Sequence, residues 1–431
     1  MRTAGFFPLL RTMLGVEQGE VRSVSLMVAH SFFIGGTTVF FETAASATFL
    51  ARFDARLLPW VYVAAAVTSL GAGLAYARLQ HRTSFAALMR GTLGVVLLLA
   101  LGLRLGFATS HAPWLAFAGL VAYRLVSSLT DLEYWAVASR LYDVGQAKRL
   151  FGLVGTGEVT ARLLGSIAVP LVVRSIGVPN LLLLSAGAVG ACLVLLEATL
   201  GDAPVESAIA VEPPSWRRGT FALLADPYVV TVVTVAVLAT FGKFFVDFGF
   251  LRQIAGRSET ELAVFLGWFG AGTQLVSLLL RVLVSRPLLE RFGVRAGVLV
   301  LPVLHALCTA LIFVAPAHAP FFVIGNQALY KSLKHPIDNA SFKVLYQPLG
   351  PRQRLGAQLL VEIFFVPAIA ATSGVVMLAF GRHYDVFGFS VVLLVTFGLW
   401  IAAGRRAGRR YDAVLSEDLP GSPHPARRAR A

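Results

Sequence analysis

The chain reads Tyr330-Lys-Ser-Leu-Lys-His-Pro-Ile-Asp-Asn-Ala-Ser-Phe-Lys-Val-Leu-Tyr346 within a stretch that is otherwise apolar enough to cross a membrane. Three of the five lysines of the chain fall in this segment, and a fourth, Lys243, lies in another apolar stretch, one turn before Asp247. An ionisable side chain at bilayer depth costs about 3 kcal/mol on insertion scales and usually marks a substrate or ion path. These lysines are therefore the first candidates for a functional site.

The composition predicts an all-α integral membrane protein. Of the 431 residues, 57% are apolar and 14% are charged, and the mean hydropathy is +0.74. A bilayer-spanning helix needs about 20 mostly apolar residues. Windows of that length give about twelve spans, at residues 22–50, 57–77, 84–107, 113–141, 147–173, 178–200, 224–251, 260–285, 295–316, 319–346, 355–381 and 384–403.

The formal net charge of +14 reflects membrane topology rather than nucleic-acid binding. If the N-terminus lies inside, most loop arginines fall in the connections on the same side, for example Arg78, Arg82, Arg286 and Arg291. This asymmetry follows the positive-inside rule and predicts that both termini are cytoplasmic. We expect a multi-pass protein of the bacterial inner membrane, with the lipid bilayer as a partner and no nucleic acid.

The spans divide into two halves of six. We expect an N-terminal cytoplasmic segment (1–20), a six-helix half (21–200), a polar cytoplasmic linker (201–220), a second six-helix half (221–404) and a basic, disordered tail (405–431). An offset of 204 residues superposes Leu141-Tyr142 on Leu345-Tyr346 and Glu158 on Glu362. Two six-helix repeats around a midplane cavity form the layout of the major facilitators, in which one half rocks against the other.

The sequence contains no enzyme signature: it has no phosphate-binding loop, no His-Glu-x-x-His and no Cys/His cluster with metal-ligand spacing. We therefore expect no enzyme activity, no cofactor and no metal. Gly155-Thr-Gly157 resembles part of a dinucleotide fingerprint but lacks the preceding strand and the third glycine. We interpret Gly152, Gly155, Gly157 and Gly165 as small faces for close helix packing.

The basic residues of the tenth span suit an anionic substrate. Lys331 and Lys334 share a helix face, and Asp338 follows Lys334 at a spacing of four. They form either a cationic wall of a cavity or, for Lys334 and Asp338, an ion pair that only locks two helices. Lys343 either contributes to this surface or extends to the membrane interface. Arg124, in the fourth span, completes the predicted substrate-binding set.

A second group of charges is predicted to act in gating or coupling. Lys243 and Asp247 are four residues apart, as are Glu158 and Arg162, and either pair is structural or opens when substrate competes. Glu362 has no basic residue within a turn, so it either holds a proton or pairs with another helix. Glu42, in the first span, joins this group.

Two stretches resemble the nucleotide (ATP/ADP) translocases of plastids and intracellular bacteria. Tyr134-Trp-Ala-Val-Ala138 with Gln146-Ala-Lys-Arg-Leu-Phe151 is similar to the Phe-Trp-x-Phe-Ala-Asn and Glu-Ala-Lys-Arg-Phe-Tyr of that family. Lys331-Ser-Leu-Lys-His with Asp338, Lys343 and Tyr346-Gln-Pro-Leu349 resembles its Lys-Tyr-Ser-Leu-Phe-Asp-Pro-Thr-Lys-Glu and Tyr-x-Pro-Leu run. The resemblance implies that the chain is a free-living bacterial relative of this family. It also implies a twelve-helix facilitator that exchanges anionic nucleotides through a central basic site.

These observations predict an alternating-access transporter of a nucleotide-like or phosphorylated anion. We expect the protein to be a monomer. One alternative is a proton-coupled facilitator for an unrelated polar solute, in which Glu362 and Glu42 matter more than the lysines. A second alternative is a membrane scaffold or sensor that keeps the fold without transporting. The retention of costly buried charges argues against the scaffold, because an idle cavity would lose them.

Overall fold

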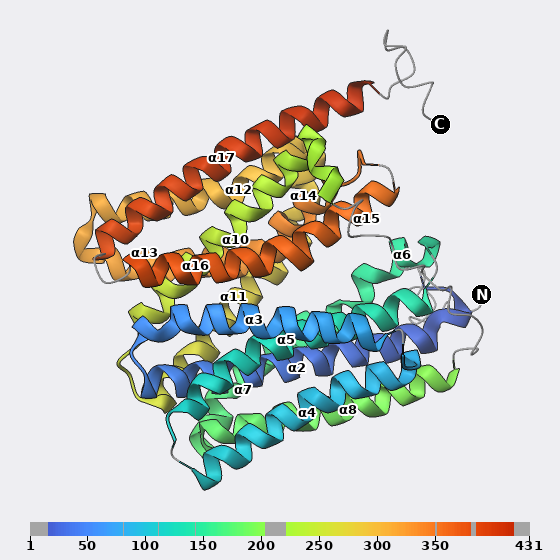
Figure 1. The fold of residues 1–431 in the computed structure, drawn as a ribbon, viewed down its shortest axis with the longest axis vertical. Helices are drawn as coiled ribbons and strands as arrows, with labels where there is room; N and C mark the ends of the chain where they lie inside the picture. Colours follow the sequence, from blue (N-terminus) through green and yellow to red (C-terminus); the bar gives the residue numbers. More distant parts are fainter. Residues whose placement is uncertain are drawn as a thin grey trace, which may run out of the picture. The chain divides into compact units, whose positions relative to one another are not determined.

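Long apolar helices follow one another along the chain, as the hydropathy pattern predicts (Figure 1). The computed structural model describes residues 16–80, 82–110, 112–142, 144–202, 221–349, 351–380 and 385–417, and these residues form no strand. The first half contains α2 (Val21–Arg52), α3 (Leu58–Leu79), α4 (Phe85–Thr109), α5 (Trp114–Leu141), α6 (Val144–Val154), α7 (Thr156–Ile176) and α8 (Leu181–Asp202). The second half contains α10 (Pro227–Ile254), α11 (Glu259–Leu283), α12 (Ser285–Val314), α13 (Ala319–Leu333), α14 (Asn339–Val344), α15 (Pro351–Leu359), α16 (Val366–Phe380) and α17 (Val386–Glu417).

Eleven helical stretches of the described residues are long and apolar enough to cross a membrane. The remaining expected span, the tenth (319–346), is interrupted, so that its longest regular helix is the 15-residue α13. The expected segments 1–15, 203–220 and 418–431, which include most of the predicted linker, lie outside the described residues.

The offset of 204 residues holds for the whole helical region. It carries α2 onto 225–256, where α10 lies, and it carries the start of α8 onto 385, next to the start of α17. The other first-half spans fall within four residues of the ends of their second-half counterparts. The six-plus-six repeat is therefore confirmed, although the sequence identities that suggested it are few.

The chain groups into two compact units, which do not follow the division at the linker. Unit 1 consists of Met1–Leu57, Val67–Ala208 and Ile254–Gln274, and unit 2 consists of Leu58–Ala66, Ile209–Gln253 and Leu275–Ala431. Each unit thus includes the beginning of a helix, α3 or α11, that belongs by sequence to the other half. The two exchanged segments are repeat counterparts, because the 204-residue offset carries Leu58–Ala66 into Ile254–Gln274.

Unit 1 is built around α2, which packs against α5, α7 and α8. The approach of α2 to α7 is close at Gly157, where an added Cβ would lie 2.1 Å from the carbonyl oxygen of Val28. A Cβ on Gly165 would lie 2.6 Å from Val39. Two of the four glycines predicted to mediate packing therefore do so. Gly152 has open space around it and Gly155 meets only a carbonyl of its own chain segment, so the prediction was wrong for these two.

In unit 2, α12 packs against α13 and α17. Gly404 and Gly408 face α12, and Arg410 donates to the carbonyl of Pro227 and to Thr231 on α10. These contacts explain why α17 continues to Glu417. The expectation of a disordered tail from 405 was therefore wrong for residues 405–417, which are helical. Their arginines are typical of a tail, but this helix packs against α12 at Gly404 and Gly408.

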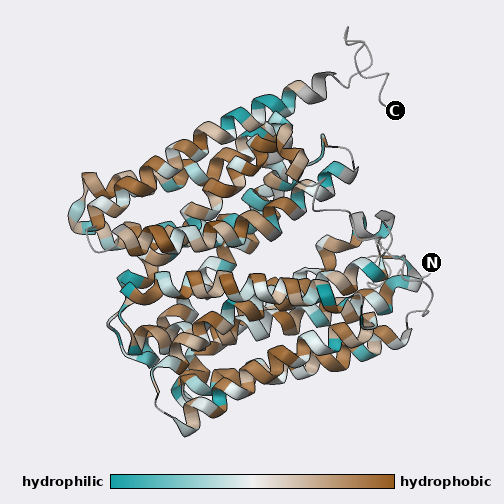
Figure 2. Cartoon of the chain, viewed as in Figure 1, coloured by the Kyte–Doolittle hydropathy of each residue, from teal (hydrophilic) through white to brown (hydrophobic). Residues whose placement is uncertain are grey.

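Many large apolar residues of the helices are exposed, and hydrophobic residues recur along the helices of the ribbon (Figure 2). Leu98, Leu171, Val194 and Phe321 are each about 70% exposed (71%, 68%, 70% and 71%). An apolar surface of this extent is incompatible with water and fits contact with lipid. The multi-pass membrane assignment is thus supported by the packing as well as by the sequence.

We expect Gly157→Ala to destabilise the protein by about 1–3 kcal/mol, because the added methyl overpacks the α2–α7 contact. Gly152→Ala is the matched control, since its Cβ meets nothing within 4 Å and alanine favours a helix. Thermal unfolding in detergent should show a lower midpoint for the first variant only. Equal midpoints for both variants would contradict the close packing at Gly157.

Candidate functional site

The tenth span is broken at the residues predicted to bind substrate. Between α13 and α14, Lys334–Asp338 forms a π-helical turn. Pro336 lies inside it and has no N–H to donate to the carbonyl four residues earlier, which weakens a regular α-helix at this point. Such turns are rare and are frequent at functional sites.

The π-turn brings the predicted Lys334 and Asp338 together. The Lys334 Nζ lies 2.5 Å from Asp338 Oδ2, with the lysine side chain 24% exposed and the aspartate side chain 6% exposed. A hydroxyl from the first residue of α12 supports the turn, because Ser285 Oγ donates to the carbonyl of Pro336 at 2.6 Å. His305 and Tyr330 lie within electrostatic range of the pair.

The eleventh span is broken in the same way at another predicted residue. Residues Leu360–Phe365 form a second π-helical turn between α15 and α16, and Glu362 lies within it. Pro367 follows and removes one backbone donor. Proline alone is not sufficient, since Pro170 and Pro302 lie inside α7 and α12 without a π-turn. Glu362 is exposed, and Lys343 is a charged neighbour within its electrostatic range.

A third arrangement joins α10, α13 and the beginning of α3, all within unit 2. Gln327 Nε2 donates to Asp247 Oδ1 at 3.2 Å, and Tyr62 Oη donates to Asp247 Oδ2 at 3.1 Å. Sequence reasoning missed both partners. Gln327 had a usable signal, because it lies four residues before Lys331 on the same helix face. Tyr62 had none, because it comes from a distant span.

The bond between Asp247 and Gln327 fixes which faces of α10 and α13 meet. Lys243 precedes Asp247 by four residues and Lys331 follows Gln327 by four, so each lysine lies one turn from this bond on its own helix. Successive membrane spans alternate in direction, and the seventh and tenth spans are therefore antiparallel. Lys243 and Lys331 accordingly lie one turn from the bond in the same direction, both half-buried, with Lys334 one further turn along. We refer to the part of unit 2 that carries Lys243, Lys331 and Lys334 as the basic face; Asp247 and Asp338 lie beside these lysines.

Unit 1 contains four of the remaining predicted residues, and two of them, Glu158 and Glu42, lie near Arg162. Arg162 Nε donates to Glu158 Oε1 at 2.9 Å. Glu42 and Asp131 lie within electrostatic range of the same guanidinium. Arg124 lies over the ring of Tyr123, 5.5 Å from its centroid. Among these residues the acids Glu158, Glu42 and Asp131 outnumber the bases Arg162 and Arg124.

One further pair in unit 1 is fully buried. His30 Nε2 lies 3.1 Å from Glu133 Oε2, and both side chains are 0% exposed. Glu133, an acid of the fourth span, is thus enclosed by the protein. The pair fastens α2 to α5.

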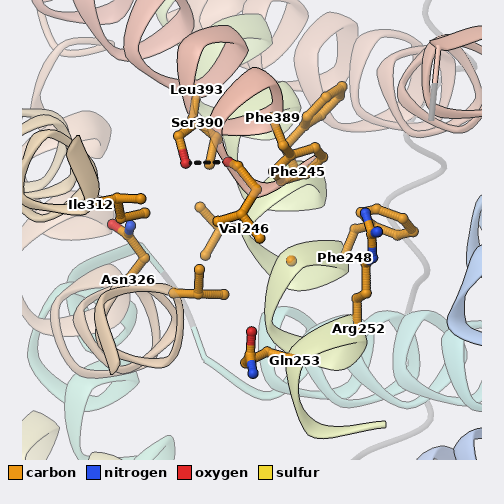
Figure 3. Close-up of a pocket in the computed structure, with 13 residues that line it drawn as sticks. Phe245, Val246, Phe248, Arg252, Gln253, Ile312, Asn326, Phe389, Ser390 and Leu393 are labelled. Carbon is orange, nitrogen blue, oxygen red and sulfur yellow. Dashed lines mark hydrogen bonds between the residues drawn. The ribbon is translucent and has the colours of Figure 1, made fainter. Parts of the chain in front are cut away.

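A cavity of about 150 Å³ lies elsewhere in unit 2 (Figure 3). Phe245, Phe248 and Phe389 form aromatic walls, while Arg252 and Gln253 lie together near one end. Among the described residues that line it, none is a predicted site residue. The cavity and the basic face are therefore separate features.

The fold is that of major-facilitator transporters. The chain is similar to the crystal structure of a bacterial homologue of the iron transporter ferroportin, with a TM-score of 0.65, 10% identity and coverage of 91% of this chain and 99% of that chain. A variant of the nucleoside transporter NupG gives a TM-score of 0.62 at 14% identity, with 91% and 99% covered. The D-xylose-proton symporter gives 0.59 at 13% identity, with 90% and 96% covered.

By sequence, the chain is 23% identical over 332 residues to the ADP,ATP carrier protein 1 of Chlamydia muridarum. This match covers 67% of the chain and 61% of the carrier, so the chain spans less than two thirds of that relative. No protein-family model matches the chain. The similarity to nucleotide translocases seen in the motifs is thus supported by a curated relative.

We expect Asp338→Asn to lower the stability by about 1–3 kcal/mol, since it leaves the Lys334 ammonium without its carboxylate; fully buried pairs lose about 3–5 kcal/mol. The double variant Lys334→Met/Asp338→Leu should recover most of this loss. Glu197→Gln is the control, because its pair with Arg90 is half exposed and should matter little. Thermal unfolding of the four proteins checks the prediction, which fails if the double variant is less stable than Asp338→Asn.

Proposed function

We propose that this protein is an alternating-access transporter of a nucleotide-like or phosphorylated anion. The observation that carries the proposal is the basic face of unit 2, where Lys243, Lys331 and Lys334 occupy adjacent turns of α10 and the broken tenth span. Lysine ammoniums bind phosphate as point charges. Their position at membrane depth is expensive, which favours a role for them in substrate binding.

The fold and the sequence similarity support the same reading. Major-facilitator transporters bind substrate near the midplane and expose it alternately to either side. The similar curated protein is named as an ADP,ATP carrier, and exchange of nucleotides is therefore the specific activity to test first. Arg124 and Lys343 remain predicted substrate contacts in this scheme. Asp247, Glu158, Arg162 and Glu42 remain predicted gating or coupling residues.

We place the protein in the bacterial inner membrane with both termini in the cytoplasm. The proposal follows from the distribution of loop arginines and the positive-inside rule. In this orientation the π-turn of Lys334–Asp338 lies in the cytoplasmic half of the tenth span, because Lys343 and the following Arg354 approach the cytoplasmic end.

Proton-coupled transport of an unrelated solute is the second candidate. It is favoured by the π-turn at Glu362, because an acid on an irregular helical turn within a span is suited to exchange a proton with solvent. In this case Glu362→Gln would abolish accumulation driven by a proton gradient, while the lysine variants would retain it.

The test is uptake of labelled ATP into liposomes that are preloaded with unlabelled ADP. We expect saturable uptake that requires internal nucleotide, and Lys331→Gln should reduce kcat/KM about tenfold or more because it removes one phosphate contact. Lys331→Gln/Lys334→Gln should reduce it further. Arg56→Gln is the charge-matched control, since its side chain is 75% exposed in a connection between spans.

The outcome separates the candidates. If uptake is unchanged in both lysine variants, the basic face does not take part in transport. If folded wild-type protein takes up no ATP, nucleotide exchange is rejected as its function. Uptake of other polar solutes under a proton gradient would then be measured.

A further inference from the structure

Asp247 lies one helical turn from Lys243, but its carboxylate is directed to other groups. Its two oxygens accept hydrogen bonds from Tyr62 at 3.1 Å and from Gln327 at 3.2 Å. The Lys243 ammonium lies over the ring of Phe244, 5.4 Å from the centroid. Tyr62 and Gln327 are therefore among the partners of the acid, and the lysine lies against an aromatic face.

Tyr62, Gln327 and Lys243 compete for the carboxylate of Asp247. Lysine at position i and an acid at i+4 is the weaker orientation of a helical ion pair, because the reverse order suits the helix dipole better. Two hydrogen bonds to a charged acceptor are each stronger than neutral ones. Tyr62 and Gln327 together can therefore outcompete Lys243 for Asp247.

Burial stabilises the hydrogen bonds that Tyr62 and Gln327 donate to Asp247. The Tyr62 side chain is 1% exposed and Gln327 is 3% exposed, and the Tyr62 ring packs edge-on against Phe244 at 5.1 Å. Phe244 therefore contacts both the tyrosine that holds Asp247 and the lysine that Asp247 would otherwise neutralise. Tyr62 itself comes from Leu58–Ala66, the part of α3 that belongs to unit 2.

We infer that Tyr62 and Gln327 are positioning residues that hold the Asp247 carboxylate away from Lys243, so that the lysine keeps its charge available for an anionic substrate. This inference rests on the proposed function and adds two residues to it. Neither residue needs to touch the substrate. Loss of the tyrosine hydroxyl removes one hydrogen bond that directs the carboxylate away from Lys243, so that the carboxylate competes with the anion for the lysine.

The experiment measures KM and kcat for ATP uptake, together with ATP binding by the detergent-solubilised protein. Tyr62→Phe should raise KM and the binding constant about threefold to tenfold, with a smaller change in kcat. The decisive variant is Tyr62→Phe/Asp247→Asn, which should restore wild-type affinity because the competing charge is gone. Asp247→Asn alone should bind ATP at least as tightly as the wild type.

A matched control removes another buried tyrosine hydroxyl from unit 2. Tyr228 Oη donates to the carbonyl of Leu345 at 2.6 Å, with no acid involved. Tyr228→Phe should therefore show no affinity loss that Asp247→Asn repairs. If Tyr62→Phe does not fold, Gln327→Met tests the same competition through the other donor.

The results separate the two proposals. If the wild type neither binds nor transports ATP, the proposed substrate class fails and the inference fails with it. If the wild type transports but Tyr62→Phe and Gln327→Met keep its affinity, only the inference is overturned. An affinity loss that Asp247→Asn does not repair would also overturn it, because the tyrosine and glutamine would then act by packing alone.

Discussion

In a bilayer every backbone carbonyl and N–H must find a partner within the protein, since hydrocarbon offers none. An unbroken helix meets this constraint by itself, and a broken helix needs help from its neighbours. In unit 1 the carbonyl of Val154, at the junction of α6 and α7, accepts from Ser31 Oγ and Tyr134 Oη at 2.7 and 2.9 Å. In unit 2 the carbonyl of Pro336 accepts from Ser285. The irregular turns that carry the candidate site therefore depend on hydroxyl groups supplied by adjacent helices.

The same constraint gives a structural meaning to parts of the motifs shared with nucleotide translocases. Tyr134 belongs to the first motif, and its hydroxyl caps the helix junction at Val154. In the second motif, the loop after the tenth span is held by Arg354, which donates to the carbonyls of Tyr346, Gln347 and Leu349. Some residues of the motifs, such as Tyr134, thus have a structural role in holding the backbone breaks.

The hydropathy pattern predicted the helices well, because membrane spans depend on length and apolar content, which are properties of single segments. The 204-residue repeat was also predictable, since the spacing of spans is preserved where residues are not. Sequence could not place Tyr62 beside Asp247, because that contact joins α3 to α10 and depends on tertiary packing. It likewise could not distinguish Gly157 from Gly152, since only the position of α2 decides which glycine is crowded. The helical extension of α17 was hidden because its arginines are typical of both a tail and a packed amphipathic end.

The repeat also shows where the two halves have diverged, and this asymmetry bears on function. Helix α5 is continuous, whereas its counterpart is interrupted at Lys334–Asp338. Glu158 has Arg162 on the next turn, but the residue equivalent to Arg162 is Val366, so Glu362 lacks that partner.

The π-turns of the described residues and an acid without a base on its next turn are therefore found in the second half, while in the first half Glu158 keeps Arg162 as its partner. Both features reduce stability, and two halves with the same ancestral plan had no structural need to differ in this way. This difference adds to the proposal that the charged part of the substrate binds in the second half.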